Sequence, residues 1–227
     1  MEIEIYADVI CPWCYIGKRR LDEALASYPG EVTVRYRPFQ LDPSPVAEPL
    51  PLVQALAGKF GGPERAQQMV AHVTQVAAAD GLRLDYDRAV IANTFDAHRL
   101  VSYATDHGRA AEMVEALYQA HFNNGLDVGS REALATLAGT IGLDAADARR
   151  FLDSDERVTE VAAELATARD LGITSVPTFV LAGKYAVSGA QEVQTLLAAL
   201  SEVEQREAAE GEQREAAEGE QREAAAR

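Results

Sequence analysis

The chain has 227 residues, of which 48% are hydrophobic, and it carries a formal net charge of −15 at pH 7. This acidic balance argues against nonspecific nucleic-acid binding, which needs a basic surface, and no apolar run reaches the length of a membrane-spanning helix. The chain holds 2 cysteines, too few for a disulfide-stapled secreted fold, and begins without the basic and apolar regions of a signal peptide, so we expect a cytoplasmic protein.

The first predicted elements are a strand and a helix that meet at a C-x-x-C motif. An apolar run rich in β-branched and aromatic residues predicts a buried strand from Ile3, the chain is expected to turn at residues 8–10, and the motif Cys11-Pro12-Trp13-Cys14 follows. Pro12 suits the first position of a helix, which we expect to cover about residues 12–27. Cys11 would then lie at the helix N-terminus, beside unpaired backbone N–H groups and the positive end of the helix dipole.

This placement predicts different roles for the two cysteines. The thiolate is the reactive form of cysteine, and a helix N-terminus stabilises it. We therefore expect Cys11 to be exposed and nucleophilic. Cys14 lies one turn deeper, on the stripe of Leu21, Leu25 and Tyr28, and should be shielded and attack back. Such a pair would exchange disulfides with another thiol compound.

Three other interpretations of the motif are open. A structural zinc site needs four ligands, but the chain has no further cysteine and its 4 histidines show no ligand spacing, so we expect no metal. In the second interpretation Cys14 is an inert core thiol beside a lone reactive Cys11. In the third the two form a structural disulfide, although so short a loop constrains the unfolded chain little. The redox interpretation is favoured over all three.

An all-helical block is expected after a second strand. Residues 32–39 alternate and predict that strand, and the short crossover favours parallel pairing with the first. The proline-rich residues 42–51 predict a loop, and residues 52–171 show helical periodicity punctuated by glycines. Ser130, Asp144 and Ser154 are expected as N-caps. The expected helices cover Leu52–Phe60, Pro63–Ala79, Tyr86–His107, Ala110–Asn123, Ser130–Ile141, Asp144–Leu152 and Ser154–Leu171.

The sheet is expected to resume beyond this block. Residues 173–181 predict a third strand, residues 182–184 a hairpin turn and residues 185–188 a fourth strand, followed by an amphipathic helix. Pro177 removes a backbone donor where the third strand begins. It is either an ordinary proline at a strand start or part of a cis Val176–Pro177 bond, a rare feature usually kept for a tight turn.

The order β-α-β, helical insert, β-β-α, with C-x-x-C at the first helix and Val-Pro-Thr before the third strand, resembles the thioredoxin superfamily. More narrowly it is similar to the DsbA family, and residues 11–17, 93–100 and 174–179 are similar to its FrnE-like branch, which is related to glutathione-dependent 2-hydroxychromene-2-carboxylate isomerases. The resemblance covers about residues 1–200. It implies an α/β thioredoxin fold with a large all-helical insertion. The implied parts are a thioredoxin-like domain of residues 1–45 and 172–203, an inserted helical domain of residues 46–171, and a charged tail of residues 204–227.

The resemblance also assigns roles within the motif. Cys11 matches the attacking cysteine and Cys14 the resolving one. Pro12 and Trp13 match the intervening pair that tunes the reduction potential. The related isomerases typically carry serine at the position of Cys11, so the full dithiol favours redox chemistry over isomerisation.

Other matched residues lie far from the motif in the sequence. Pro177 matches the cis-proline that faces the disulfide, and Val176 the residue whose backbone pairs with an extended substrate segment. The segment of residues 93–100 is expected to border the active-site cleft. His98 and Arg99 would there favour the Cys11 thiolate or hold a carboxylate of substrate or glutathione, unless they are simply part of a solvated polar face.

One departure from the family concerns proton transfer. Many members have a buried acid six residues before the first cysteine, where this chain has Ile5. Either Asp8, at the end of the first strand, or a water molecule would then move the proton of Cys14; otherwise Cys14 is deprotonated slowly.

We therefore expect a thiol–disulfide oxidoreductase of the DsbA family. Its partner would be a protein or low-molecular-weight compound that bears a thiol or disulfide, with no bound cofactor and with glutathione open as a redox partner. One alternative is a glutathione-dependent isomerase or transferase on the same fold. Another is a redox-sensing or chaperone-like module that exposes its groove when oxidised.

The end of the chain is an octapeptide repeat. Residues 204–211 recur as residues 212–219 and, with Ala-Arg in place of Glu-Gly, as residues 220–227. A period of eight is not a heptad, and the glycines weaken an otherwise helix-forming unit. We expect a solvated, partly helical extension of the last helix and assign it no function.

Overall fold

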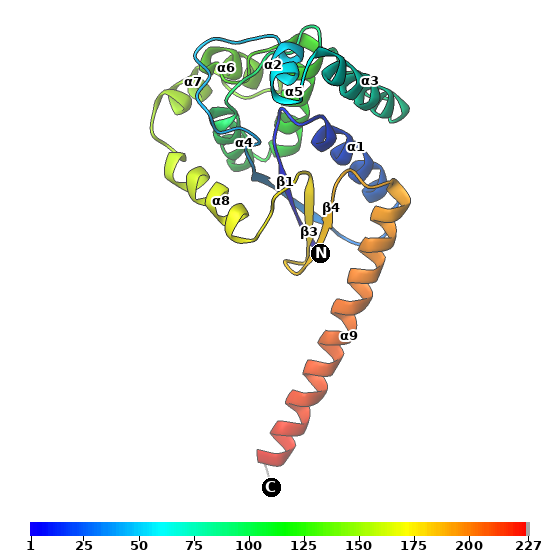
Figure 1. The fold of residues 1–227 in the computed structure, drawn as a ribbon. Coiled ribbons are helices and arrows are strands. Elements are labelled where there is room, and N and C mark those ends of the chain that lie inside the picture. Colours follow the sequence, from blue (N-terminus) through cyan, green and yellow to red (C-terminus); the bar gives the residue numbers. More distant parts are fainter. Residues whose placement is uncertain (226–227) are drawn as a thin grey trace.

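A computed structural model describes the backbone of residues 1–225 and the side chains of residues 1–213. A mixed sheet lies at the centre of the molecule (Figure 1). Its strands are β1 (Glu2–Ala7), β2 (Thr33–Pro38), β3 (Thr178–Leu181) and β4 (Tyr185–Ser188). They are ordered β2-β1-β3-β4; β1 and β2 are parallel and the other neighbours antiparallel. The parallel first pair and the β3–β4 hairpin confirm the predicted arrangement.

Helices occupy the positions that the hydrophobic periodicity predicts, and the order β-α-β, helical block, β-β-α is confirmed. The first helix has its predicted bounds because Pro12 fits its first turn and the Tyr28-Pro29-Gly30 breaker follows its last. In the described part of the chain the helices are α1 (Pro12–Ser27), α2 (Leu52–Lys59), α3 (Pro63–Ala79), α4 (Phe95–Asp106), α5 (Ala110–Asn124), α6 (Arg131–Thr140), α7 (Ala145–Asp153), α8 (Val158–Asp170) and α9 (Val193–Ala225).

Three predicted elements begin too early, and the third, the helix expected from Ser154, is described with its N-cap below. Residues 86–94 are not helical, because they pair with the proline-rich loop instead: Leu52 N–H donates to Ala89 O at 2.8 Å and Ile91 N–H to Leu50 O at 2.9 Å. Residues 173–177 are likewise not part of a strand, and β3 starts only after Pro177, which has no N–H for a ladder.

The predicted N-caps have mixed outcomes. The side chains of Ser130 and Asp144 accept hydrogen bonds from the backbone N–H groups three residues ahead, as predicted. The prediction for Ser154 is wrong, because Ser154 ends α7, where its hydroxyl donates to Phe151 O at 2.8 Å. α8 begins only after Arg157, whose φ of 59° is left-handed.

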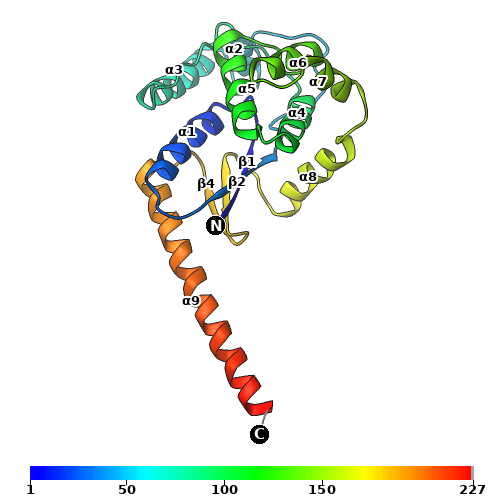
Figure 2. The same cartoon turned by 180° about the vertical axis from the view of Figure 1, so that it is seen from behind.

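The buried side chains of the described residues form two hydrophobic cores. One lies between the sheet face of Ile3 and Phe179 and the helices α1 and α9, and the other fills the helical block and reaches the start of α1. Figure 1 and Figure 2 show α1 and α9 on one side of the sheet and α4 and α8 on the other. The predicted domain bounds stay a prediction, but the second core includes Cys11 and Cys14, so the motif lies where the two halves meet.

The last helix extends well beyond the sheet (Figure 1). α9 runs without a break to Ala225, so the predicted helical extension is continuous through the described repeats. The final residues of the predicted tail, 226–227, lie outside the described residues. No helix of the described chain combines the length and the apolar character that crossing a membrane requires.

Candidate active site

The start of α1 brings the two cysteines together. Cys11 is the N-cap, with an extended φ of −92° and ψ of 114°, and its carbonyl accepts from Cys14 N–H at 3.1 Å and from Tyr15 N–H at 3.3 Å. Both cysteines are free and lie 3.4 Å apart. The helix turn therefore holds two thiols in contact, the arrangement that a dithiol–disulfide pair needs.

Both thiols are buried. Cys11 is only 4% exposed and Cys14 only 1%, so the prediction of an exposed Cys11 is wrong. The Cys11 thiol contacts a distant loop, because it donates to the Val176 carbonyl, with Sγ and O 3.8 Å apart. Trp13 is the exposed member of the motif, with 36% of its surface accessible, and its ring lies 6.0 Å from that of His72 on α3, centroid to centroid.

Cys14 belongs to a different core from the one predicted. It packs with Tyr15 and Ile16 in the core of the helical block, whereas Leu21 of α1 packs on the sheet. Burial raises the pKa of the Cys14 thiol well above its ordinary value, and the hydrogen bond with Cys11 and the negative charge of Asp8 raise it further. Cys14 is therefore a protonated thiol at neutral pH and needs a base before it can attack.

The loop over Cys11 contains the predicted cis Val176–Pro177 bond, which is confirmed. Pro177 packs onto α1 at Gly17, where an added Cβ would lie 2.8 Å from Pro177 Cγ and 3.2 Å from Phe179 Cζ. Glycine lets the loop and the helix approach this closely, and so sets the Val176 carbonyl above Cys11. This role of Gly17 was not predicted, since a glycine inside a helix normally indicates only weakened helix formation.

Asp8 and His98 form a buried pair behind the motif. Asp8 is fully buried, its Oδ2 accepts from Leu41 N–H at 2.7 Å, and its Oδ1 lies 3.5 Å from His98 Nε2. His98 Nε2–H in turn donates to Phe39 O at 2.9 Å. A backbone hydrogen bond from Asp8 acts in the opposite direction on Cys14 and lowers the pKa of its thiol. The structure thus brings His98 to Asp8 on the Cys14 side of the pair.

Arg99 lies elsewhere and has a structural role. Its side chain is fully buried, and all of its guanidinium nitrogens bond within the protein, so it has no nitrogen without a partner to offer a substrate carboxylate. This differs both from the predicted cleft role and from the solvated alternative. Its partners are the Asp96 carboxylate and the backbone carbonyls of Phe151, Leu152, Ser154 and Glu156.

Within the described residues, no three histidine, cysteine, aspartate or glutamate side chains gather as metal ligands would. The site's own groups offer the following chemistry. These are a contacting dithiol at a helix N-terminus, a loop carbonyl hydrogen-bonded to Cys11, and the buried Asp8 carboxylate, whose negative charge raises the pKa of Cys14.

Comparison with known proteins gives a consistent result. The family described as the DSBA-like thioredoxin domain matches residues 2–201. Among solved structures, the chain is similar to the probable DsbA oxidoreductase SCO1869 of Streptomyces coelicolor, with 38% identity, a TM-score of 0.84 and 89% of each chain covered.

Two more distant structures share the fold. A 2-hydroxychromene-2-carboxylate isomerase is 19% identical, with a TM-score of 0.67, over 92% of this chain and 98% of its own. The cytosolic disulfide reductase DsbM of Pseudomonas aeruginosa, solved with GSH, is also 19% identical, with a TM-score of 0.64, over 91% of this chain and 100% of its own.

Proposed function

Because this chain belongs to the family of DsbA-like thioredoxin domains, we propose that it is a thiol–disulfide oxidoreductase that works through Cys11 and Cys14. The observation that carries the proposal is the contact between two free cysteines at the N-terminus of α1. A single cysteine at this place would support only the formation of an adduct. Two in contact can close a disulfide and release the bound partner.

The reaction follows from the positions of the two thiols. The Cys11 thiolate, at the helix N-terminus, attacks one sulfur of a partner disulfide; that S–S bond breaks, and the other sulfur leaves as a thiolate. Cys14 then attacks Cys11 Sγ, releases the second partner thiolate and closes the Cys11–Cys14 disulfide. Oxidation of a partner dithiol is the same sequence in reverse.

The groove for the partner would be formed by Val176 and Pro177. The Val176 carbonyl points at Cys11 Sγ, so an extended segment bound along this loop would bring its sulfur to the attacking thiol. Trp13, the exposed member of the motif, would contact the same segment. As parts of the motif, Pro12 and Trp13 would also tune the reduction potential.

We propose glutathione as the low-molecular-weight thiol with which the protein exchanges. We also propose that the protein works in the cytoplasm. Likeness to DsbM supports both, since that protein is a cytosolic disulfide reductase that was solved with GSH. A glutathione-dependent isomerase or transferase is the second candidate. Its support is the fold shared with a 2-hydroxychromene-2-carboxylate isomerase, together with the burial of Cys11 below a loop that a small substrate could displace.

The variant Cys14→Ser separates the two candidates. It should form a mixed disulfide between Cys11 and glutathione that persists, because no second thiol remains to displace glutathione, whereas the unchanged protein should release it. Mass spectrometry of the intact protein after incubation with oxidised glutathione measures the adduct. If the unchanged protein kept glutathione as long as the variant does, and a glutathione-dependent activity survived Cys14→Ser, the isomerase candidate would replace the oxidoreductase.

A further inference from the structure

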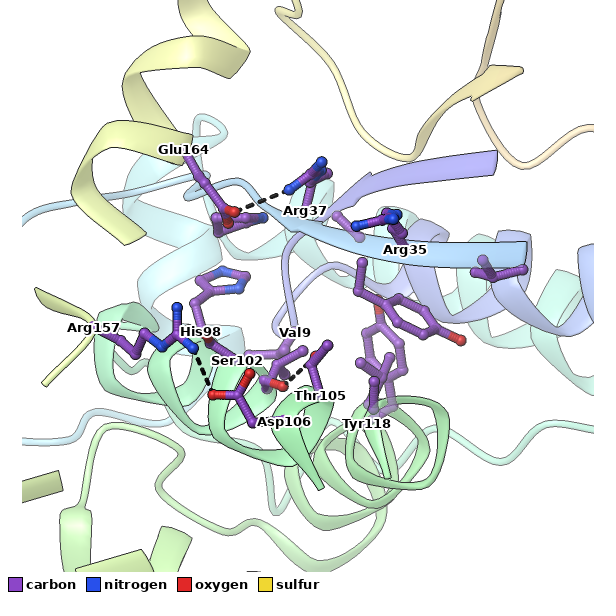
Figure 3. Close-up of a pocket in the computed structure, with 17 residues that line it drawn as sticks. Val9, Arg35, Arg37, His98, Ser102, Thr105, Asp106, Tyr118, Arg157 and Glu164 are labelled. Atoms are coloured by element: carbon purple, nitrogen blue, oxygen red, sulfur yellow. Dashed lines mark hydrogen bonds and ion pairs between the residues drawn. The ribbon is translucent and has the colours of Figure 1, made fainter. Parts of the chain in front are cut away.

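Ion pairs attach the helical block to the rest of the protein at several places. Figure 3 shows one of them, between Arg37 of β2 and Glu164 of α8 at 2.9 Å, beside a cavity of about 270 Å³. A second pair in the same view, Arg157 with Asp106 at 2.7 Å, lies within the block. The first pair joins the block to the sheet. The attachment of the block to α1, the helix that carries the dithiol, depends on other residues.

Two buried cations on α1 attach that helix to the block. Lys18 Nζ lies 3.0 Å from Glu115 of α5, and Arg20 Nε lies 2.8 Å from Asp80, which ends α3. Both cations are more than nine-tenths buried. Residues two positions apart face different sides of a helix, so the two cations hold the block from different directions.

Arg20 also holds a third segment, the loop between β4 and α9. Its Nη1 donates to the carbonyl of Ala190 at 2.8 Å and pairs with the exposed Glu192, also at 2.8 Å. In the same loop the N–H of Gly189 donates to the carbonyl of Pro177 at 2.8 Å. The planar guanidinium can donate to several acceptors at once, so one side chain links α1 and the end of α3 to the loop that holds the cis-proline segment.

The contact with Asp80 fixes α3 beside the motif. His72 of α3 lies against Trp13, with ring centroids 6.0 Å apart, and Asp80 lies against Arg20. About two helical turns separate these two contacts on each helix, so α1 and α3 run side by side in the same direction, as Figure 1 and Figure 2 show. Met69, exposed and one turn before His72, is therefore level with the N-terminal end of α1.

Both segments that Arg20 fixes reach the motif. α3 contacts Trp13 through His72, and the cis-proline segment accepts a hydrogen bond from the Cys11 thiol at the Val176 carbonyl. An extended polypeptide bound along Val176 would touch both segments, whereas a small disulfide needs only the thiol. The relative position of the two segments should therefore decide how well a polypeptide docks.

We propose that Arg20 is a positioning residue for polypeptide partners. It fixes α3 and the cis-proline segment relative to the dithiol, and so favours exchange with a disulfide in an extended polypeptide over exchange with a small disulfide. This inference rests on the proposed function and adds partner choice to it.

The experiment compares two disulfides in exchange with the reduced protein. One is the oxidised dimer of a short, tryptophan-free peptide with a central cysteine flanked by leucines. The other is 2-hydroxyethyl disulfide, which has no peptide backbone. Trp13 is the single tryptophan of the chain, so its emission in a stopped-flow instrument follows closure of the Cys11–Cys14 disulfide. The readout is the second-order rate constant for the peptide divided by that for 2-hydroxyethyl disulfide.

Arg20→Met should lower this ratio about tenfold and change the rate with 2-hydroxyethyl disulfide less than about threefold. Misplacing a docking surface by about 1 Å costs up to about 10²-fold, and only the peptide depends on that surface. Asp80→Ala removes the α3 contact alone and should lower the ratio about threefold. It also tests the proposal if Arg20→Met does not fold.

Lys18→Met is the matched control. It removes an equally buried cation from the same helix, together with an attachment to α5, but leaves the contacts of Arg20 in place. A general loosening of the block would lower the rates with both disulfides, so it would not change their ratio. The ratio of Lys18→Met should therefore stay within about twofold of that of the unchanged protein.

The possible results separate this inference from the proposed function. An unchanged ratio in folded Arg20→Met overturns the role of Arg20, and if that variant does not fold, an unchanged ratio in Asp80→Ala does so. An equal fall of the ratio in Lys18→Met also overturns it. An unchanged protein that exchanges with neither disulfide overturns the proposed function, and this inference with it.

Discussion

Cys11→Ser is expected to lower thiol–disulfide exchange to the uncatalysed rate. A serine hydroxyl stays protonated at neutral pH and cannot open a disulfide, and the remaining thiol, Cys14, is 1% exposed with a raised pKa. The measurement is the initial rate at which reduced protein exchanges with oxidised glutathione, followed through the release of reduced glutathione.

Cys14→Ser is the matched control for this loss. It keeps the attacking thiol and should still release one equivalent of reduced glutathione per protein, at a rate within about a factor of ten of the unchanged protein. The assignment of Cys11 as the attacking residue would be contradicted by exchange that survives Cys11→Ser and disappears in Cys14→Ser.

Arg99→Met is expected to have the largest effect on stability, a loss of about 3–5 kcal/mol in the free energy of unfolding. The substitution leaves Asp96 and four backbone carbonyls without the donors that Arg99 supplies to them. These carbonyls lie where α7 ends and the chain turns toward α8, so the joint between the two helices should loosen. Urea unfolding followed by circular dichroism measures the loss.

Arg131→Met is the control, because Arg131 pairs with the same Asp96 but is 44% exposed at its side chain. Exposed pairs contribute about 0–1 kcal/mol, so its loss should stay within that range. The exchange rate of folded Arg99→Met should match that of the unchanged protein within about twofold. A normal stability with a strongly reduced exchange rate would instead support the role of Arg99 at the cleft.

Much of the fold was predictable because its signals are local. The bounds of α1 follow from Pro12 and the breaker after Ser27, and the β3–β4 turn follows from Ala182-Gly183-Lys184 between two apolar runs. The errors at residues 86–94 and 173–177 share one cause. In residues 86–94 the helical pattern is present, but the backbone groups pair with the proline-rich loop instead. In residues 173–177 the β-branched pattern is present, but Pro177 has no N–H to donate to a neighbouring strand.

The candidate site was predictable only in part, because its remaining features depend on distant contacts. The motif itself marks Cys11 and Cys14, but the hydrogen bond of the Cys11 thiol goes to Val176, 165 residues away. The pairing of Asp8 with His98 joins a strand end to a helix of the inserted block. Arg99 follows His98 in the sequence and yet points into a different part of the protein, since neighbouring positions on a helix face different directions.

The most direct test of the central claim is the redox equilibrium of the Cys11–Cys14 pair. The protein is equilibrated in graded mixtures of reduced and oxidised glutathione, its free thiols are alkylated, and the species are quantified by mass spectrometry. The account predicts a single two-electron transition from dithiol to an intramolecular disulfide, with a midpoint between about −270 and −120 mV, the range of C-x-x-C oxidoreductases. Glutathione that stays on Cys11 in every mixture, with no Cys11–Cys14 disulfide formed, would contradict it.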